Sequence, residues 1–141
     1  MAKEKKDLKI LIVDDNEKDL KLLEIKLSQL GFSNVIKAEG GKEALELARE
    51  HLPDLILLDI AMPGLDGGQV RHLLDENPKT KDIFTVFISS FVTDEETKRL
   101  EGMIRGHLII AKPYTSDKLS EVINKASVHY YWKDKRNSSA T

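Results

Sequence analysis

The chain has 141 residues, of which 40% are hydrophobic and 33% charged, and its formal net charge is -2. This size and balance are typical of one globular domain and exclude a disordered chain. The absence of a basic excess argues against nucleic-acid binding, and no apolar stretch approaches the ~20 residues that cross a bilayer. The sequence contains no cysteine, which excludes disulfides and thiolate chemistry. We therefore expect a cytoplasmic protein without direct nucleic-acid binding or membrane insertion.

Five short apolar runs with the length of strands alternate with segments of helical periodicity. In chain order, the predicted strands are Leu8–Val13, Asn34–Ala38, Leu55–Asp59, Ile83–Ser89 and Leu108–Ala111. The first run is rich in branched residues and too short for a buried helix. Because helical segments separate the strands, right-handed crossovers are expected to build a parallel sheet with helices on both faces. The sequence therefore predicts an α/β domain with a doubly wound five-stranded sheet.

Apolar residues at helical spacing mark four of the helices expected between and after these strands. They lie within Leu20–Leu30, Ala44–Ala48, Val70–Leu74 and Leu119–Tyr130. Gly31 has the position of a left-handed cap at the end of the first helix. Thr93 and the acids after it predict the capped start of a further helix between the last two strands. The charged residues 1–7 and the polar tail 133–141 are expected to be flexible, which leaves a domain over residues 8–132.

Polar side chains stand at the carboxyl ends of four predicted strands. Asp14 and Asp15 follow the first, Asp59 ends the third, Ser89 ends the fourth and Lys112 follows the fifth. The carboxyl ends of parallel strands lie along one edge of the sheet, where ligands bind. Carboxylates, a hydroxyl and an ammonium would therefore converge there. Such a set can hold a divalent cation and a phosphoryl group.

Each of these residues also has a simpler interpretation. Asp14-Asp15-Asn16 would serve as a helix cap, and Asp59 would begin a turn. Lys112 alone is more often a solvated charge, and Ser89 a loop hydroxyl. The combination of compatible groups at four strand ends favours a shared site, because carboxylates suit magnesium and can attack phosphorus to form an aspartyl phosphate. Lys112 and Ser89 would then stabilise the phosphoryl oxygens.

From roughly Leu8 to Tyr130, the chain resembles the receiver domain of bacterial two-component response regulators. The resemblance rests on three motifs: ILIVDDN at Ile10–Asn16, PDLILLDIAMPGLDG at Pro53–Gly67, and KPY at Lys112–Tyr114. It implies a flavodoxin-like fold with strand order 2-1-3-4-5. It also implies partners, namely a sensor histidine kinase or a histidine phosphotransfer protein that donates the phosphoryl group, and a downstream protein that the sequence does not identify.

The resemblance further implies a role for each residue at the strand ends. Asp59 would accept the phosphoryl group, and Ser89 and Lys112 would bind it, with the Lys112-Pro113 peptide bond in the cis form. Asp15 and Asp59 would bind magnesium directly, together with the main-chain carbonyl of Ala61, and Asp14 would help to hold the ion, for example through water.

One departure from the usual receiver pattern bears on signalling, and two further positions bear on the lifetime of the phosphorylated form. Receivers often carry an aromatic switch residue three positions before the lysine, and this chain has Ile109 there. The usual signalling face is therefore expected to be read differently or weakly. Ala61 and Phe91 occupy the positions where the family tunes access of the hydrolytic water. Neither side chain can hydrogen-bond to water, so we predict a comparatively long-lived aspartyl phosphate.

The leading hypothesis is a single-domain regulator, monomeric or weakly dimeric, that signals through phosphorylation-dependent protein contacts and is not an enzyme beyond its own phosphorylation and dephosphorylation. An aspartate-dependent phosphatase or phosphotransferase is the second class, but it would need an acid where Ala61 stands. A receiver-like interaction scaffold that phosphorylation does not control is the third, supported only by Ile109. The aromatic run Tyr130–Trp132 either packs on the rim of the domain or contacts a partner.

Overall fold

The computed structural model describes residues 7–99, 103–104 and 106–126. Apart from Asp7, the ends predicted to be flexible (1–7 and 133–141) lie outside these residues, as does the aromatic run Tyr130–Trp132. The domain limits 8–132 therefore stay a prediction. None of the described helices is long and apolar enough to cross a membrane.

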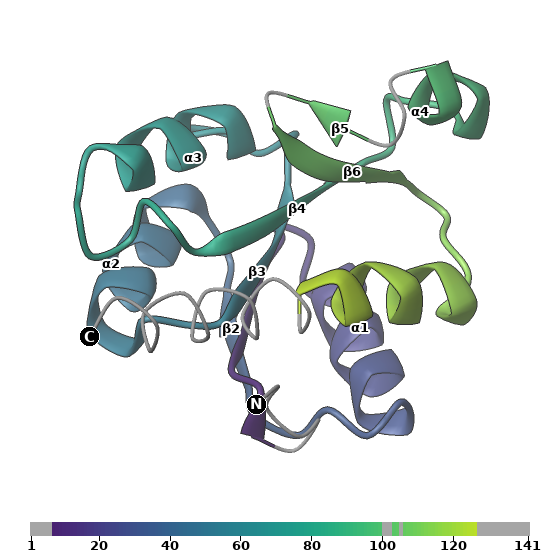
Figure 1. The fold of residues 1–141 in the computed structure, drawn as a ribbon, viewed down its shortest axis with the longest axis horizontal. Coiled ribbons are helices and arrows are strands. Elements are labelled where there is room, and N and C mark those ends of the chain that lie inside the picture. The colour runs from purple at the N-terminus through teal and green to yellow at the C-terminus, as the bar shows by residue number, and fades with distance from the viewer. Residues whose placement is uncertain (1–6, 100–102, 105, 127–141) are drawn as a thin grey trace, which may run out of the picture.

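A six-stranded sheet with the order β2-β1-β3-β4-β6-β5 forms the centre of the fold (Figure 1). Its strands are β1 Ile10–Val13, β2 Val35–Ala38, β3 Leu55–Asp59, β4 Phe84–Ser89, β5 Met103–Ile104 and β6 His107–Ala111. All pairs except β5–β6 are parallel. Because β6 is the fifth predicted strand, the five predicted strands have the predicted order 2-1-3-4-5. The antiparallel strand β5 was not predicted, because two residues are too few to show a periodicity.

The helices are α1 Glu17–Gln29, α2 Gly41–His51, α3 Gly67–Asp75, α4 Asp94–Arg99 and a last helix over 116–126. The side chain of Asn16 caps α1 by accepting hydrogen bonds from two backbone N–H groups of its first turn. At the other end, Gly31 has a φ of 97°, which confirms the predicted left-handed cap. The N–H of Phe32 then donates to the carbonyl of Leu27 at 2.9 Å and directs the Phe32 ring into the core.

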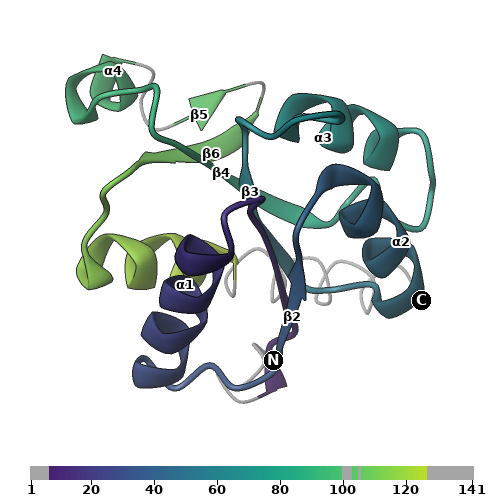
Figure 2. The same ribbon diagram turned by 180° about the vertical axis from the view of Figure 1, so that it is seen from behind.

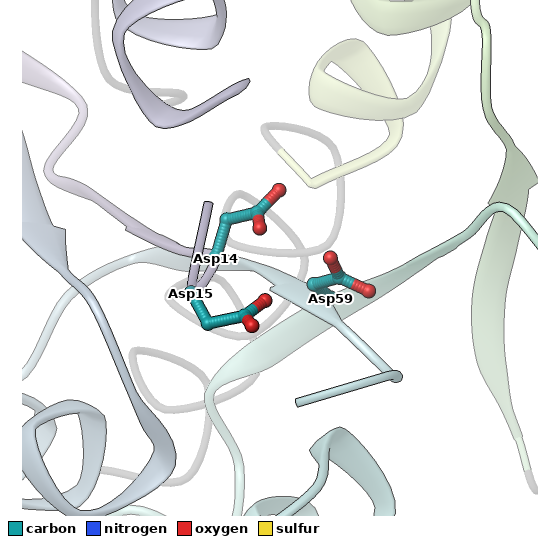
Figure 3. A group of neighbouring side chains, drawn as sticks. All are labelled: Asp14, Asp15 and Asp59. Carbon is teal, nitrogen blue, oxygen red and sulfur yellow. The ribbon is translucent and has the colours of Figure 1, made fainter. Parts of the chain in front are cut away.

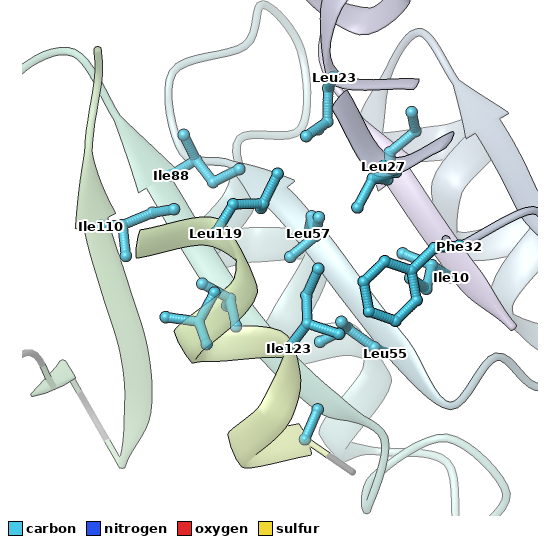
Figure 4. Close-up of a cluster of buried hydrophobic side chains, with 14 of the residues drawn as sticks. Ile10, Leu23, Leu27, Phe32, Leu55, Leu57, Ile88, Ile110, Leu119 and Ile123 are labelled. Carbon is cyan, nitrogen blue, oxygen red and sulfur yellow. The ribbon is translucent and has the colours of Figure 1, made fainter. Parts of the chain in front are cut away.

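Two hydrophobic layers pack on opposite faces of the sheet, because successive strand side chains point to opposite sides. On one face, α1 and the helix over 116–126 bury apolar residues against Ile10, Leu57 and Ile88 (Figure 4). On the other, α2 and α3 cover Leu11, Leu58 and their neighbours. Figure 2 shows the same arrangement from behind, with the sheet between the two pairs of helices. The prediction of helices on both faces is confirmed.

Helix α4 lies beside β5 and β6 at the edge of the sheet (Figures 1 and 2). Its sequence, DEETKR, contains no apolar residue that it could bury against a sheet face. Its start has the predicted cap: the hydroxyl of Thr93 accepts a hydrogen bond from the N–H of Glu96 at 3.1 Å. The capping signal therefore identified a helix, whereas the polar composition explains its place at the edge.

Candidate functional site

The register of the parallel strands brings the predicted site residues to one edge. Val13 pairs with Leu58, so the residues after them, Asp14 and Asp59, leave neighbouring strands at the same height. On the other side of the centre, Ser89 pairs with Ala111, the residue before Lys112. Neighbouring strands thus deliver their polar ends to a common place, as the sequence predicts.

Three carboxylates converge at this edge (Figure 3). One oxygen from each of Asp14, Asp15 and Asp59 lies within 4.8 Å of the other two. Asp14 and Asp59 are buried, with 5% and 7% of their surface exposed, whereas Asp15 is open to solvent. Buried carboxylates are costly unless a positive charge or hydrogen bonds compensate them.

The ammonium of Lys112 provides part of this compensation. Its Nζ donates to Oδ2 of Asp14 at 2.7 Å and to Oδ2 of Asp59 at 3.1 Å. Burial by itself would lower the pKa of Lys112, but its hydrogen bonds to the two carboxylates, and their negative charge, outweigh burial and raise that pKa. Lys112 therefore remains a cation at the bottom of an acidic pocket.

Burial has the opposite effect on the carboxyl group of Asp59. It is the largest cause of a raised pKa at Asp59, and the nearby charge of Asp14 adds to it. The hydrogen bond and charge of Lys112 and the backbone N–H of Ala61 lower the same pKa, but by less. The carboxylate of Asp59 is therefore the form that this pocket holds at a free-energy cost, and an added cation would relieve that cost.

Backbone groups fix the orientation of Asp59 and Ser89. The N–H of Ala61 donates to Oδ1 of Asp59 at 3.0 Å, while Oδ2 faces Lys112. The hydroxyl oxygen of Ser89, which is 2% exposed, accepts from the N–H of Phe91 at 3.0 Å. Phe91 itself is 78% exposed. The Lys112-Pro113 peptide bond is cis, as the family resemblance led us to expect.

Gly67, the first residue of α3, determines how closely the start of this helix can approach the end of β3. A Cβ atom at this position would lie 2.6 Å from the carbonyl oxygen of Asp59 and 2.8 Å from the Cα of Ile60. The N–H of Gly67 donates to the carbonyl of Ile60 at 2.9 Å, which closes the loop. In the sequence, Gly67 is the last residue of the motif Pro53–Gly67. The close approach to Asp59 becomes visible only in three dimensions.

Sequence reasoning also missed a fourth acidic residue, Asp19 of α1. Its Oδ2 lies 3.4 Å from the Nζ of Lys112. Together with Leu22 and Lys26 of the same helix, it lines a cavity of about 360 Å³ that reaches Asp59 and Lys112. An acid in the first turn of a helix has an ordinary explanation in the helix dipole, and this explanation hid its proximity to the site.

The residues present fit magnesium. Hard oxygen ligands from one or two carboxylates, completed by water and phosphate oxygens, are its usual environment in proteins. Here the Asp14, Asp15 and Asp59 oxygens lie within 4.8 Å of one another, and among the described residues the ammonium of Lys112 is the one cation that forms ion pairs with this group. Because carboxylates outnumber cations, the pocket carries an excess of negative charge that a divalent cation would neutralise.

Ile109, the residue at the usual aromatic switch position, is buried in the layer beneath α2 and α3, with 2% of its surface exposed. It belongs to β6 and pairs with Phe87 of β4. It therefore fills part of the core in this structure. The weaker signalling face that we expected from its presence stays a prediction.

Comparison with known families matches residues 10–124 to the response regulator receiver domain. Protein PilH of Pseudomonas aeruginosa is 35% identical over 117 residues, which cover 82% of this chain and 94% of PilH. The polar-differentiation response regulator DivK of Brucella anthropi is 35% identical over 116 residues, covering 81% of this chain and 91% of DivK.

Solved structures have the same fold. A response regulator from Desulfuromonas acetoxidans superposes with a TM-score of 0.68 and 31% identity, over 83% of this chain and 94% of that chain. The chemotaxis protein CheY4 of Vibrio cholerae superposes with a TM-score of 0.70 over 84% of this chain and 97% of that chain, and at 24% identity this likeness supports the fold alone. The chain belongs to the family of response regulator receiver domains.

Proposed function

We propose that Asp59 accepts a phosphoryl group, with magnesium held by Asp14, Asp15, Asp59 and the main-chain carbonyl of Ala61. The observation that carries this proposal is the position of Asp59 within an acidic cluster and in contact with the ammonium of Lys112. One of its carboxylate oxygens lies 3.1 Å from that ammonium. The other accepts a backbone hydrogen bond of 3.0 Å, so the carboxylate has a fixed orientation.

The chemistry is a nucleophilic transfer. A carboxylate oxygen of Asp59 attacks the phosphorus of a phosphohistidine, the new O–P bond forms, and the P–N bond breaks with the electron pair returning to the imidazole. Bound magnesium would supply positive charge against the phosphoryl oxygens. Lys112 stabilises the same charge with its ammonium, and the buried hydroxyl of Ser89 donates a hydrogen bond. The Asp59 carboxylate needs no deprotonating base, because it attacks in its ionised form.

The same residues support a signalling phosphoacceptor over an enzyme that acts on small molecules. Such an enzyme needs a second acid two residues after the nucleophile, to protonate the leaving group. Ala61 stands at this position and has no ionisable group. The chemistry proposed for this chain is therefore limited to its own phosphorylation and to hydrolysis of its own aspartyl phosphate.

The proposed partners follow from the chemistry. A sensor histidine kinase or histidine phosphotransfer protein provides the phosphohistidine, and a downstream protein reads the phosphorylated state. PilH and DivK are matched over 94% and 91% of their lengths, which supports action through the receiver domain and its protein contacts. We place this exchange in the cytoplasm, where kinases generate phosphohistidine from ATP.

Intact-mass measurement after incubation with acetyl phosphate tests the proposal. The wild-type chain should gain one phosphoryl group only when magnesium is present, and Asp59→Asn should gain none. Circular dichroism of both proteins shows that each is folded. A folded wild-type protein that gains no mass contradicts the proposal and favours an interaction scaffold that phosphorylation does not control.

A further inference from the structure

We propose that Asp19 restrains phosphorylation by competing with the phosphoryl group for the ammonium of Lys112. This inference rests on the proposed function and adds a regulatory residue to the same site. Asp19 would be neither a phosphoacceptor nor a magnesium ligand. It would be a positioning residue that acts through Lys112.

The three contacts of Lys112 differ in strength and burial. The Nζ lies 2.7 Å from Asp14 and 3.1 Å from Asp59, whose side chains are 7% and 9% exposed. It lies 3.4 Å from Asp19, whose side chain is 45% exposed. An ammonium has three hydrogens to donate, and in this arrangement three carboxylates accept them. A phosphoryl group on Asp59 therefore competes with Asp14 and Asp19 for the ammonium, and the contact with Asp19, the longest and most exposed, is the cheapest to give up.

The backbone near Lys112 is held without Asp19. The N–H of Lys112 donates to the carbonyl of Ser89 at 2.9 Å, which continues the ladder between β4 and β6. On α1, Lys26 donates to the carbonyl of Tyr114 at 3.4 Å and lies 4.9 Å from the centroid of its ring. A change at Asp19 therefore leaves the backbone of Lys112 and Tyr114 in place. It acts on the position of the ammonium and on the negative charge around it.

The charge of Asp19 also acts on both partners of the site. Its carboxylate adds a negative charge at the wall of the pocket, next to Lys112. This negative charge attracts a divalent cation and repels an incoming phosphoryl donor. Replacing Asp19 with asparagine should thus weaken magnesium binding and, when magnesium is saturating, speed phosphoryl uptake. A purely structural loss would lower both, so the opposite signs identify an electrostatic role.

The ordinary role of Asp19 is to stabilise the first turn of α1, where an acid interacts favourably with the helix dipole. Glu17 has this role as well, because it is an acid in the same turn. It is exposed and lines a different depression, with Lys21 and Lys37. Like Asp19→Asn, Glu17→Gln removes one negative charge from the chain and one favourable interaction with the helix dipole. It does so without touching Lys112.

The experiment compares Asp19→Asn, Asp19→Glu and Glu17→Gln with the wild-type chain. Intact mass follows the rate of phosphorylation by acetyl phosphate at saturating magnesium, and isothermal titration calorimetry measures magnesium affinity. Asp19→Asn should be phosphorylated about threefold faster and bind magnesium about threefold more weakly, the scale expected for partly exposed charges. Asp19→Glu and Glu17→Gln should match the wild type in both measurements.

Three outcomes would overturn the inference. If the wild type gains no phosphoryl group, it fails together with the proposed function. If the wild type is phosphorylated and Asp19→Asn behaves as Glu17→Gln does, Asp19 has no special role, while the proposed function stands. If Asp19→Asn is slower and also melts at a lower temperature than Glu17→Gln, the role of Asp19 is structural.

Discussion

The ammonium of Lys112 lies 2.7 Å from Oδ2 of Asp14, although 98 positions separate the two residues in the sequence. The contact places a fixed positive charge among carboxylates that otherwise suit a divalent cation. Lys112 therefore has two opposite effects. It lowers the negative potential that attracts magnesium, and it provides positive charge where a phosphoryl group would arrive.

Replacing Lys112 with methionine should separate these effects. Magnesium should bind more tightly, because the competing cation is gone, whereas phosphorylation by acetyl phosphate should slow by about 100-fold or more, the usual loss for a preorganised charge-stabilising group. Calorimetry and intact-mass kinetics measure the two quantities. Magnesium binding that weakens in Lys112→Met would contradict this account of the pocket.

The raised pKa of Asp59 makes the stability of the magnesium-free protein depend on pH. A carboxyl group whose pKa is raised on folding holds its proton more tightly in the native state. The stability that it contributes is therefore fully present below the ordinary value of 3.8 and is lost as pH rises through the folded pKa. Relative to Asp59→Asn, the wild type should lose free energy of unfolding over this interval, as measured by urea titration without magnesium. A gap between the two proteins that stays constant with pH would argue against burial as the main influence on Asp59.

Hydrolysis of the aspartyl phosphate should be slow because neither Ala61 nor Phe91 has a side-chain group that could orient a water molecule. Ala61 is half-buried and apolar, and Phe91, whose backbone N–H donates to Ser89, is exposed and also apolar. Ala61→Asn and Phe91→Glu each introduce a polar group there, and each should shorten the lifetime of the phosphorylated form several-fold. The lifetime is read from the decay of the phosphorylated mass after the donor is removed. Unchanged decay in both variants would show that these positions do not control the water.

A buried arginine fixes the connection between α3 and β4. Arg71 is 3% exposed, and its guanidinium donates to the carbonyls of Ile83 and Lys81 and to the hydroxyl of Thr85, each at 2.8 Å. It also forms two hydrogen bonds with Oδ1 of Asp75, one turn further along α3. The side chain thus satisfies polar groups of the loop that would otherwise be buried without a partner.

Arg71→Met should lower the free energy of unfolding by about 3 kcal/mol or more, because it removes the guanidinium that donates to these carbonyls and pairs with Asp75. Asp75→Asn, at a half-exposed partner, should cost much less. Chemical denaturation measures both. At temperatures where the variant is folded, its phosphorylation rate should match that of the wild type, since Arg71 does not contact the site. Equal stability losses in the two variants would mean that the ion pair, and not the loop carbonyls, is what Arg71 contributes.

The phenol of Tyr114 should titrate late. Burial is the largest cause that raises its pKa, to about 12, and the nearby charge of Lys112 only partly opposes this effect. The difference in absorbance at 295 nm between the wild type and Tyr114→Phe isolates this group from the other tyrosines. Its midpoint should lie well above the ordinary value of 10.0. Stability that depends on the neutral phenol is then lost as pH rises from the unfolded value through about 12. A midpoint near the ordinary value would show that Tyr114 is solvated.

Local patterns in the sequence were sufficient to predict the parallel strands, the capped helices and the residues at the strand ends. Apolar runs of four to six residues have few alternatives to a buried strand when helical segments separate them. Caps such as Asn16, Gly31 and Thr93 act within a few residues, so their effect is visible in a short window. The carboxyl ends of parallel strands share one edge in any such sheet, which is why Asp14, Asp59 and Lys112 could be predicted to meet.

Other features required the tertiary structure. Three features depend on segments that are far apart in the chain or that pack across a loop. They are the contact of Asp19 with Lys112, the approach of Gly67 to Asp59 and the burial of Arg71. Each depends on the register of the strands and on the way the helices rest on the sheet, and neither leaves a periodic trace in the sequence. The sequence by itself determined which polar residues stand at the carboxyl ends of the strands, because residue type and strand position are local properties. Only the tertiary structure decided which charges face Lys112, because electrostatic interactions act through distances in space and not along the chain.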